Sequence, residues 1–127
     1  MRISHLRPGN ETAILASPEL FDEAPNPEAA RSYLADDRNI FLLPPEGSNV
    51  TGFLRGTGLG QLTSTRRQMF LYEIAVLPEF RRHGIAGELI RWLLDFCRER
   101  GFEEVFVFTD PAYEAAAKLY QSTGSVT

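Results

Sequence analysis

The segment from residue 81 to residue 86 combines residue types that suit a phosphate group. It reads Arg81-Arg82-His83-Gly84-Ile85-Ala86 and stands where the strongest helical pattern of the chain begins. A helix N-terminus presents unpaired N–H groups and about half a positive charge, so it favours an anion. Gly84 allows close approach to the backbone, Ala86 leaves the next turn open, and the two arginines add planar donors. These features favour a diphosphate site; the alternative is an exposed basic loop before an ordinary helix.

A strand before this turn and a helix after it must position it. Gln68 to Val76 is the strongest predicted strand, and Pro78 ends it. Gly84 to Arg100 is predicted as a helix, because its apolar residues recur at helical spacing. Glu104 to Thr109 follows as a second strand, so the two strands should be parallel neighbours with a right-handed crossover.

The rest of the chain supplies the other predicted elements. These are a strand at Arg2–Arg7, a weak helix at Glu11–Phe21 interrupted by Pro18, a helix that Asn26 caps and that reaches about Asp36, strands at Asn39–Leu43 and Val50–Arg55, and a last helix at Asp110–Thr123. Gly56, Gly58 and Gly60 lack the dinucleotide-binding spacing and predict a flexible loop or a bulge. This order of elements predicts one α/β (α+β) domain with a mixed sheet.

Two stretches of the sequence resemble motifs of the GNAT superfamily of N-acetyltransferases. The run from Ile74 to Ala86 resembles the core motif, Q/R-x-x-G-x-G/A. Glu114-Ala115-Ala116-Ala117-Lys118-Leu119-Tyr120, with Gly124 after it, is similar to the second motif, N-x-x-A-x-x-x-Y, although Tyr113 stands where Asn is usual. Within the family the chain is most similar to aminoglycoside 3-N-acetyltransferases, in its segments Tyr72–Val76, Thr109–Pro111 and Leu119–Gly124.

The resemblance implies that acetyl-CoA is the co-substrate and that three parts of the chain contact it. The pyrophosphate would bind the turn, the pantetheine arm would pair with the strand backbone, and the last helix would add further contacts. The residues concerned are Arg81, Arg82, His83, Gly84, Ile85 and Ala86 in the turn, Ile74, Ala75 and Val76 in the strand, and Tyr113 and Ala116 in the helix.

The resemblance also implies the architecture, which is a GNAT-like mixed sheet with helices on both faces. The family normally continues with one or two strands beyond the position of Thr127. We therefore expect these C-terminal strands to be missing or supplied by a partner, and we expect a homodimer, because an exposed sheet edge favours association.

Glu73 is the candidate general base. Two-residue alternation along its strand gives it the same face as Leu71 and Ala75, while its immediate neighbours face the other way. A carboxylate on a mostly apolar strand is costly to bury unless it is paired or used. Glu73 could take a proton from a substrate ammonium, directly or through water, could hold a cationic substrate by charge, or could form a structural ion pair.

Tyr120 is the candidate general acid. The resemblance gives its phenol a position from which it could protonate or hydrogen-bond the thiolate of CoA. From the residues alone, the alternative is a core aromatic whose hydroxyl reaches solvent. Cys97 lies on the apolar stripe of the long helix and is predicted to be a buried small hydrophobe. His5 and His83 lack ligand spacing, so we expect no metal.

Composition narrows the classes of partner. The 127 residues carry a formal net charge of −4, which argues against nucleic acid and in favour of a cationic substrate. No apolar run approaches the roughly 18 residues of a membrane span. The N-terminus has no signal-peptide pattern, and a single cysteine suits a reducing compartment. We therefore expect a cytoplasmic protein with no membrane partner.

The sequence as a whole predicts a single acetyltransferase domain over residues 1–127. It would transfer an acetyl group from acetyl-CoA to a primary amine of a cationic small molecule by direct attack. An aminoglycoside, and with it antibiotic resistance, is one candidate; polyamines and protein amines are others. A non-catalytic acyl-CoA-binding or sensing module and a phosphate-binding interaction domain are the alternatives on the same fold.

Overall fold

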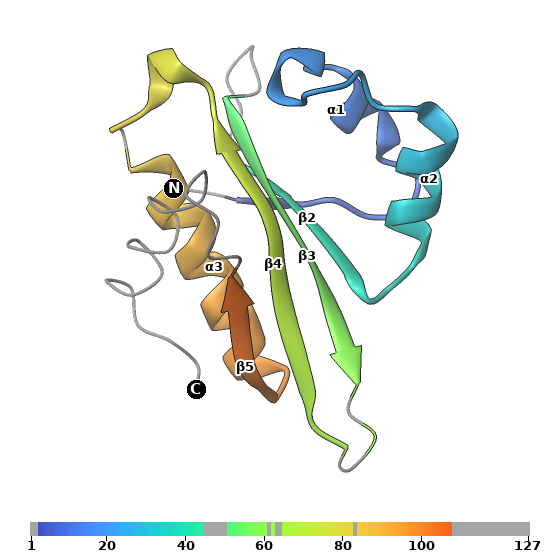
Figure 1. The fold of residues 1–127 in the computed structure, drawn as a ribbon, viewed down its shortest axis with the longest axis vertical. Helices are drawn as coiled ribbons and strands as arrows, with labels where there is room; N and C mark the ends of the chain where they lie inside the picture. Colours follow the sequence, from blue (N-terminus) through green and yellow to red (C-terminus); the bar gives the residue numbers. More distant parts are fainter. Residues whose placement is uncertain (1–2, 45–50, 61, 63–64, 83, 108–127) are drawn as a thin grey trace.

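The computed structural model describes residues 3–44, 51–60, 62, 65–82 and 84–107. Within them, five strands form one mixed sheet in the order β1-β2-β3-β4-β5 (Figure 1). The strands are β1 (Ser4–His5), β2 (Asn39–Leu43), β3 (Gly52–Gly60), β4 (Arg67–Val76) and β5 (Phe102–Val107). β4 and β5 are parallel neighbours, and the other pairs are antiparallel. The predicted mixed sheet and its parallel strand–helix–strand unit are thus confirmed.

Helices cover both faces of this sheet (Figure 1). On one face lies α3 (Ile85–Glu99), whose buried side chains pack with Leu54 and Leu71 of the sheet. On the other lie α1 (Glu11–Leu15), the short 3-10 helix η1 (Pro18–Leu20) and α2 (Pro27–Ala35), which pack around Phe41 and Phe53. Adjacent residues of β2 and β3 therefore feed two separate cores, as the period-2 alternation of a strand requires.

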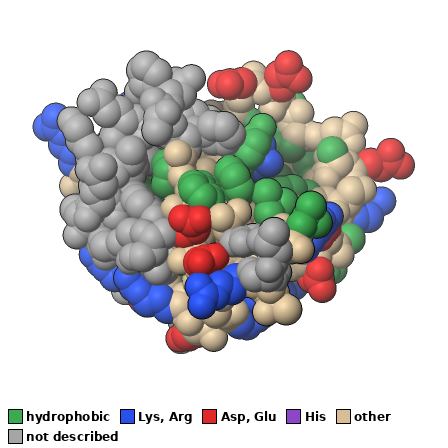
Figure 2. Space-filling model, turned by 60° about the horizontal axis from the view of Figure 1, so that its bottom comes forward, with side chains coloured by type: hydrophobic (Ala, Val, Ile, Leu, Met, Phe, Trp, Pro, Cys, Tyr) green, Lys and Arg blue, Asp and Glu red, His purple; other side chains and the backbone are tan. Residues whose placement is uncertain are grey.

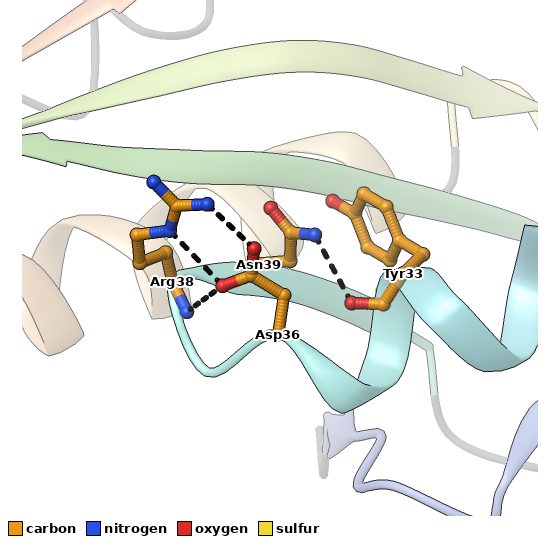
Figure 3. A network of polar contacts seen from close by, with 4 residues as sticks. All are labelled: Tyr33, Asp36, Arg38 and Asn39. Atoms are coloured by element: carbon orange, nitrogen blue, oxygen red, sulfur yellow. Dashed lines mark hydrogen bonds and ion pairs between the residues drawn. The ribbon is translucent and has the colours of Figure 1, made fainter.

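Local signals fix both ends of α2. At its start the side chain of Asn26 accepts a hydrogen bond from the Ala29 amide at 2.9 Å, as predicted for a capping residue. At its end Asp36 accepts three hydrogen bonds from Arg38, and the Asn39 side chain donates to the Tyr33 carbonyl at 3.0 Å (Figure 3). These contacts hold the turn into β2 and so fix the last turn of α2, which carries Tyr33.

The three glycines predicted as a flexible loop or a bulge belong to β3, which continues to Gly60 rather than ending at Arg55. The loop interpretation is wrong. The register of β3 and β4 does shift between Arg55 and Gly56, but the extra residue of this bulge lies in β4 and not among the glycines. A Cβ on Gly56 would lie 2.6 Å from the Phe70 carbonyl oxygen, and one on Gly58 would lie 3.0 Å from the ring of Phe102. Glycine is used here because neighbouring groups approach the strand closely, not because the chain is loose.

Other predicted boundaries shift by a few residues. β1 is shorter than the predicted strand, and the weak helix divides at Pro18 into α1 and η1. β5 begins at Phe102, two residues before its predicted start. The predicted last helix, Asp110–Thr123, lies outside the described residues.

Candidate active site

A bulge divides β4 at the level of the candidate base. Arg55 of β3 is opposite Glu73, but the next residue, Gly56, is opposite Leu71, so Tyr72 is the extra residue of β4. The parallel pairing with β5 is described as far as Leu71. Beyond the bulge, among the described residues, no strand pairs with the second edge of residues 73–76.

The bulge also decides which face Glu73 occupies. Leu71, Ile74 and Val76 all pack in the core beneath α3, whereas Ala75 packs with the core beneath α1 and α2. The prediction that Glu73 shares a face with Leu71 is wrong, because the extra residue between them reverses the alternation. Glu73 does share the face of Ala75 and points toward α2, where it lines a cavity.

Glu73 forms an ion pair with Arg55 across the two strands. Nε of Arg55 lies 2.7 Å from Oε1 of Glu73, and about a quarter of each side chain is exposed. The Arg55 guanidinium carbon lies 4.1 Å from the centre of the Tyr72 ring and 5.6 Å from that of Tyr33. The guanidinium is thus held between two aromatic faces, a favourable cation–π arrangement. The structural ion pair, one of the three alternatives for Glu73, is present.

Tyr33 anchors this group to the sheet. Its hydroxyl lies within hydrogen-bond distance of two carbonyl oxygens, that of Gly56 at 2.8 Å and that of Ile40 at 2.9 Å. Burial raises the pKa of Tyr33 to about 12, despite the opposing effect of Arg55. The phenol is therefore neutral at physiological pH and donates its proton to a backbone carbonyl.

Sequence reasoning missed both Tyr33 and Arg55. Arg55 carries the one charge in a run of strand-forming and small residues, Gly52–Gly60, and that isolation was the available signal. Tyr33 offered no signal, because an aromatic residue on an amphipathic helix is usually a packing residue.

A cavity of about 250 Å³ opens on the α2 side of the sheet, next to the Arg55–Glu73 pair. Most of its lining is apolar, and its charged lining residues are Arg55 and Glu73. The full lining is Ile14, Phe21, Pro25, Asn26, Ala29, Ala30, Tyr33, Phe41, Arg55 and Glu73. The cavity can hold a small organic molecule, with the carboxylate of Glu73 as an anionic group within reach.

The turn between β4 and α3 has an unusual backbone. It follows the 3-10 helix η2 (Pro78–Phe80), and Nε of Arg81 donates to the Val76 carbonyl at 3.2 Å, which ties the turn to the end of β4. Arg82 has φ 69° and Gly84 has φ 79°. Left-handed backbone costs a residue with a side chain about 1–2 kcal/mol, so Arg82 stores strain in the turn. Both arginines are exposed.

The N-terminus of α3 has the donors and the space for an anion. Gly84 is the N-cap and makes no side-chain capping bond, and the first bond inside the helix runs from the Glu88 amide to the Gly84 carbonyl. The amides of residues 85–87 therefore point out of the helix end. A Cβ built on Gly84 or on Gly87 would meet no atom within 4 Å. This donor set, with two guanidinium groups close by in sequence, fits a diphosphate.

Several predicted site residues fall outside the described residues. They are His83, Tyr113, Ala116 and Tyr120. Cys97 is described, and its prediction is confirmed: it is fully buried, and burial raises its pKa to about 12. Such a thiol is protonated at neutral pH, which argues against a nucleophile.

The described part of the chain contains neither a cluster of metal ligands nor a membrane-spanning helix. There, no three His, Cys, Asp or Glu side chains come together in a group that could hold a metal ion. No helix of the same residues combines the length and the apolar character needed to cross a bilayer.

The comparisons with known proteins agree with one another on the family of this chain. A model described as the acetyltransferase (GNAT) family matches residues 10–124. The chain is 31% identical over 97 residues to N-acetyltransferase 8 of Homo sapiens, an alignment that covers 76% of this chain and 43% of that protein. The chain thus spans less than half the length of the curated relatives that it matches.

Solved structures show the same fold. An aminoglycoside acetyltransferase from an uncultured soil metagenomic sample, in complex with sisomicin, has a TM-score of 0.84 and 25% identity, covering 96% of this chain and 86% of that one. The enzyme AAC(6')-Iy, in complex with a CoA bisubstrate analogue, has a TM-score of 0.77 and 20% identity, covering 97% and 88%. The second likeness is one of fold alone.

Proposed function

This chain belongs to the GNAT family of acetyltransferases, and on that premise we propose that it transfers an acetyl group from acetyl-CoA to a primary amine of a cationic substrate. One observation carries the proposal. α3 follows β4 and the η2 turn, begins at a left-handed glycine and has no side-chain cap at its N-terminus. A Cβ built on that glycine would meet no described atom within 4 Å. The family's co-substrate has a diphosphate, the group that such a helix end favours.

Acetyl-CoA would bind at the N-terminus of α3 and along the last residues of β4, which meet at this turn. Its diphosphate would accept hydrogen bonds from the amides of residues 85–87 at the start of α3, next to Gly84, with Arg81, Arg82 and His83 contributing charge or donors. Its pantetheine arm would pair with the backbone of Ile74, Ala75 and Val76. The bulge at Tyr72, which interrupts the regular pairing of β4 directly before these residues, supports this arm. Tyr113 and Ala116 would add contacts, as the sequence motif predicts.

The reaction is direct acyl transfer. The amine must first lose a proton, and Glu73, or a water beside it, would accept that proton. The amine nitrogen then attacks the thioester carbonyl carbon, the new C–N bond forms, and the C–S bond breaks. The nitrogen loses its second proton as the amide forms, and that proton, passed through water, replaces the one that Tyr120 supplies. Tyr120 would donate a proton to the departing thiolate, so the products are an N-acetyl amine and free CoA thiol. The ion pair with Arg55 would hold the carboxylate of Glu73 in a fixed orientation.

The acceptor is a primary amine that carries positive charge in solution. An aminoglycoside is the first class to test, because of the sequence resemblance and because a solved neighbour at 25% identity holds sisomicin. The 3-N position predicted from the sequence stays a prediction, as do the homodimer and the cytoplasmic location. Polyamines and protein amines belong to the same test.

Two measurements test the proposal in sequence. Calorimetric titration should detect binding of acetyl-CoA and not of ATP. Thiol release from acetyl-CoA should then depend on an added amine, and mass spectrometry should find that amine heavier by one acetyl group. Binding without amine-dependent thiol release would point instead to an acyl-CoA-sensing module. Absence of acetyl-CoA binding would overturn the proposal.

A further inference from the structure

We propose that the acceptor is an amine with a single positive charge whose remainder is apolar and about the size of one aromatic ring, bound in the cavity beside Glu73. This inference rests on the proposed acetyl transfer and narrows its second substrate. It differs from the polycationic acceptors that net charge and resemblance suggest.

The walls of the cavity are mostly apolar. The side facing the helices is formed by aliphatic and small residues, of which Ile14 and Ala30 are buried, and the floor includes Phe41. The Phe41 ring stacks on Phe53 at 5.2 Å, and Phe21 lies 4.7 Å from the same Phe53 ring. Aromatic side chains held in this way form a firm apolar surface, which favours an apolar ligand over a sugar.

Two polar groups in the cavity walls are already engaged by the backbone. The Asn26 side-chain oxygen accepts the Ala29 amide, and the Tyr33 hydroxyl donates to a backbone carbonyl. Sugar hydroxyls buried here would find few free groups with which to bond, and an unmatched buried hydroxyl is costly. An acceptor rich in hydroxyl groups would therefore lose more on leaving water than it gained.

The two charges in the cavity lining have opposite signs. Among the described residues that line the cavity, Glu73 is the one acidic residue, and Arg55 lies 2.7 Å from it. The formal charge of the lining is therefore zero. One ammonium group can approach the carboxylate of Glu73, but a second and third would be desolvated with no anion to receive them. The local charge thus suits a monoamine, although the chain as a whole carries a net charge of −4.

The cavity is large enough for one aromatic ring. A cavity of about 250 Å³ exceeds the roughly 150 Å³ of an apolar cavity that takes up benzene, so a ring with a short linker fits.

Hydrophobic side chains also gather near the centre of the molecular face shown in Figure 2, with acidic and basic side chains at the edges of the group. One of the large exposed apolar residues is Tyr72, which covers the guanidinium of Arg55.

The experiment measures thiol release from acetyl-CoA with four probes: phenethylamine, ethylamine, spermidine and kanamycin. We expect kcat/KM for phenethylamine to exceed that for ethylamine by about tenfold or more, because the ring gains apolar contact in the cavity. We expect spermidine and kanamycin to be poorer acceptors than phenethylamine.

A pair of alanines on α2 supplies the matched variants. Ala29 lines the cavity and Ala35 does not, yet both are exposed positions of one helix, so a larger side chain should not prevent folding at either. Ala29→Leu should reduce kcat/KM for phenethylamine by about tenfold while changing the value for ethylamine by less than about threefold. Ala35→Leu should leave both values unchanged.

The outcomes separate the inference from the function beneath it. Turnover of kanamycin or spermidine with phenethylamine rejected would overturn the inference and leave acetyl transfer standing. An equal effect of Ala29→Leu on both monoamines would also overturn it. Thiol release with none of the four amines would overturn the inference, whereas absence of acetyl-CoA binding by calorimetry would overturn the acetyl transfer itself.

Discussion

Arg55 of β3 and Glu73 of β4 face each other directly across the sheet, at the last matched pair before Tyr72 enters β4 as an extra residue. Their side chains meet at 2.7 Å beside an apolar cavity. Had β4 been regular, Glu73 would have occupied the opposite face, beneath α3. The position of the candidate base therefore depends on a single inserted residue.

Replacing Glu73 with Gln tests whether its carboxylate takes part in the reaction. Glu73→Gln keeps the size of the side chain and removes the charge, so kcat/KM should fall by about 100- to 10,000-fold if the carboxylate accepts the proton of the amine. Steady-state kinetics and thermal unfolding should be measured together. Asp95→Asn is the control, since Asp95 forms an exposed ion pair with Arg98 on α3. Full activity of Glu73→Gln, with only a lower melting temperature, would leave the ion pair a structural role alone.

Replacing Gly84 with Ala tests the helix end that would bind the diphosphate. Because φ is 79° there, Gly84→Ala should cost about 1–2 kcal/mol of folding stability and should weaken acetyl-CoA binding. Gly9→Ala is a matched control: Gly9 has φ 96°, and a Cβ there also meets nothing within 4 Å. Both variants should lose stability, and only Gly84→Ala should lose affinity by calorimetry. Comparable affinity in the two would exclude the turn as the site.

Tyr33 should make the alkaline stability of the fold pH-dependent. Its pKa is raised from 10.0 to about 12 by burial, so its contribution is complete below pH 10 and is lost as the pH rises toward 12. Tyr33→Phe should lower the free energy of unfolding at pH 7 by about 1 kcal/mol, through the lost hydrogen bond. It should also flatten the loss of stability between pH 10 and 12.

Urea unfolding across this pH range provides the measurement. Tyr72→Phe is the control, because Tyr72 is exposed and its hydroxyl has no comparable burial. Burial also raises the pKa of Cys97 to about 12, but this residue is common to all the variants and cancels in the comparison. Parallel pH profiles for Tyr33→Phe and the unmodified protein would contradict the prediction.

Replacing Tyr120 with Phe tests the general acid. Tyr120→Phe should leave acetyl-CoA affinity nearly intact and lower kcat by about 10- to 1,000-fold, within or just below the range for one lost acid–base group. Asp95→Asn on α3 again serves as the control. Unchanged turnover in Tyr120→Phe would remove this residue from the mechanism.

The sequence alone was sufficient for the elements around the turn. Asn26 and Pro27 marked the start of α2, apolar spacing marked α3, and Gly84 marked the turn before α3, because each signal acts on the residues next to it. The family followed from the same local runs. Local patterns thus identified the fold class and one half of the candidate site.

Only the tertiary structure decided the other half. The bulge at Tyr72, the length of β3 and the pairing of Arg55 with Glu73 depend on how two strands align, and residues 18 positions apart in sequence leave no local trace of that alignment. The same alignment, with Tyr33 brought against β3, forms the apolar cavity. Sequence suggested a substrate defined by net charge, whereas packing produced a cavity whose own charge is balanced.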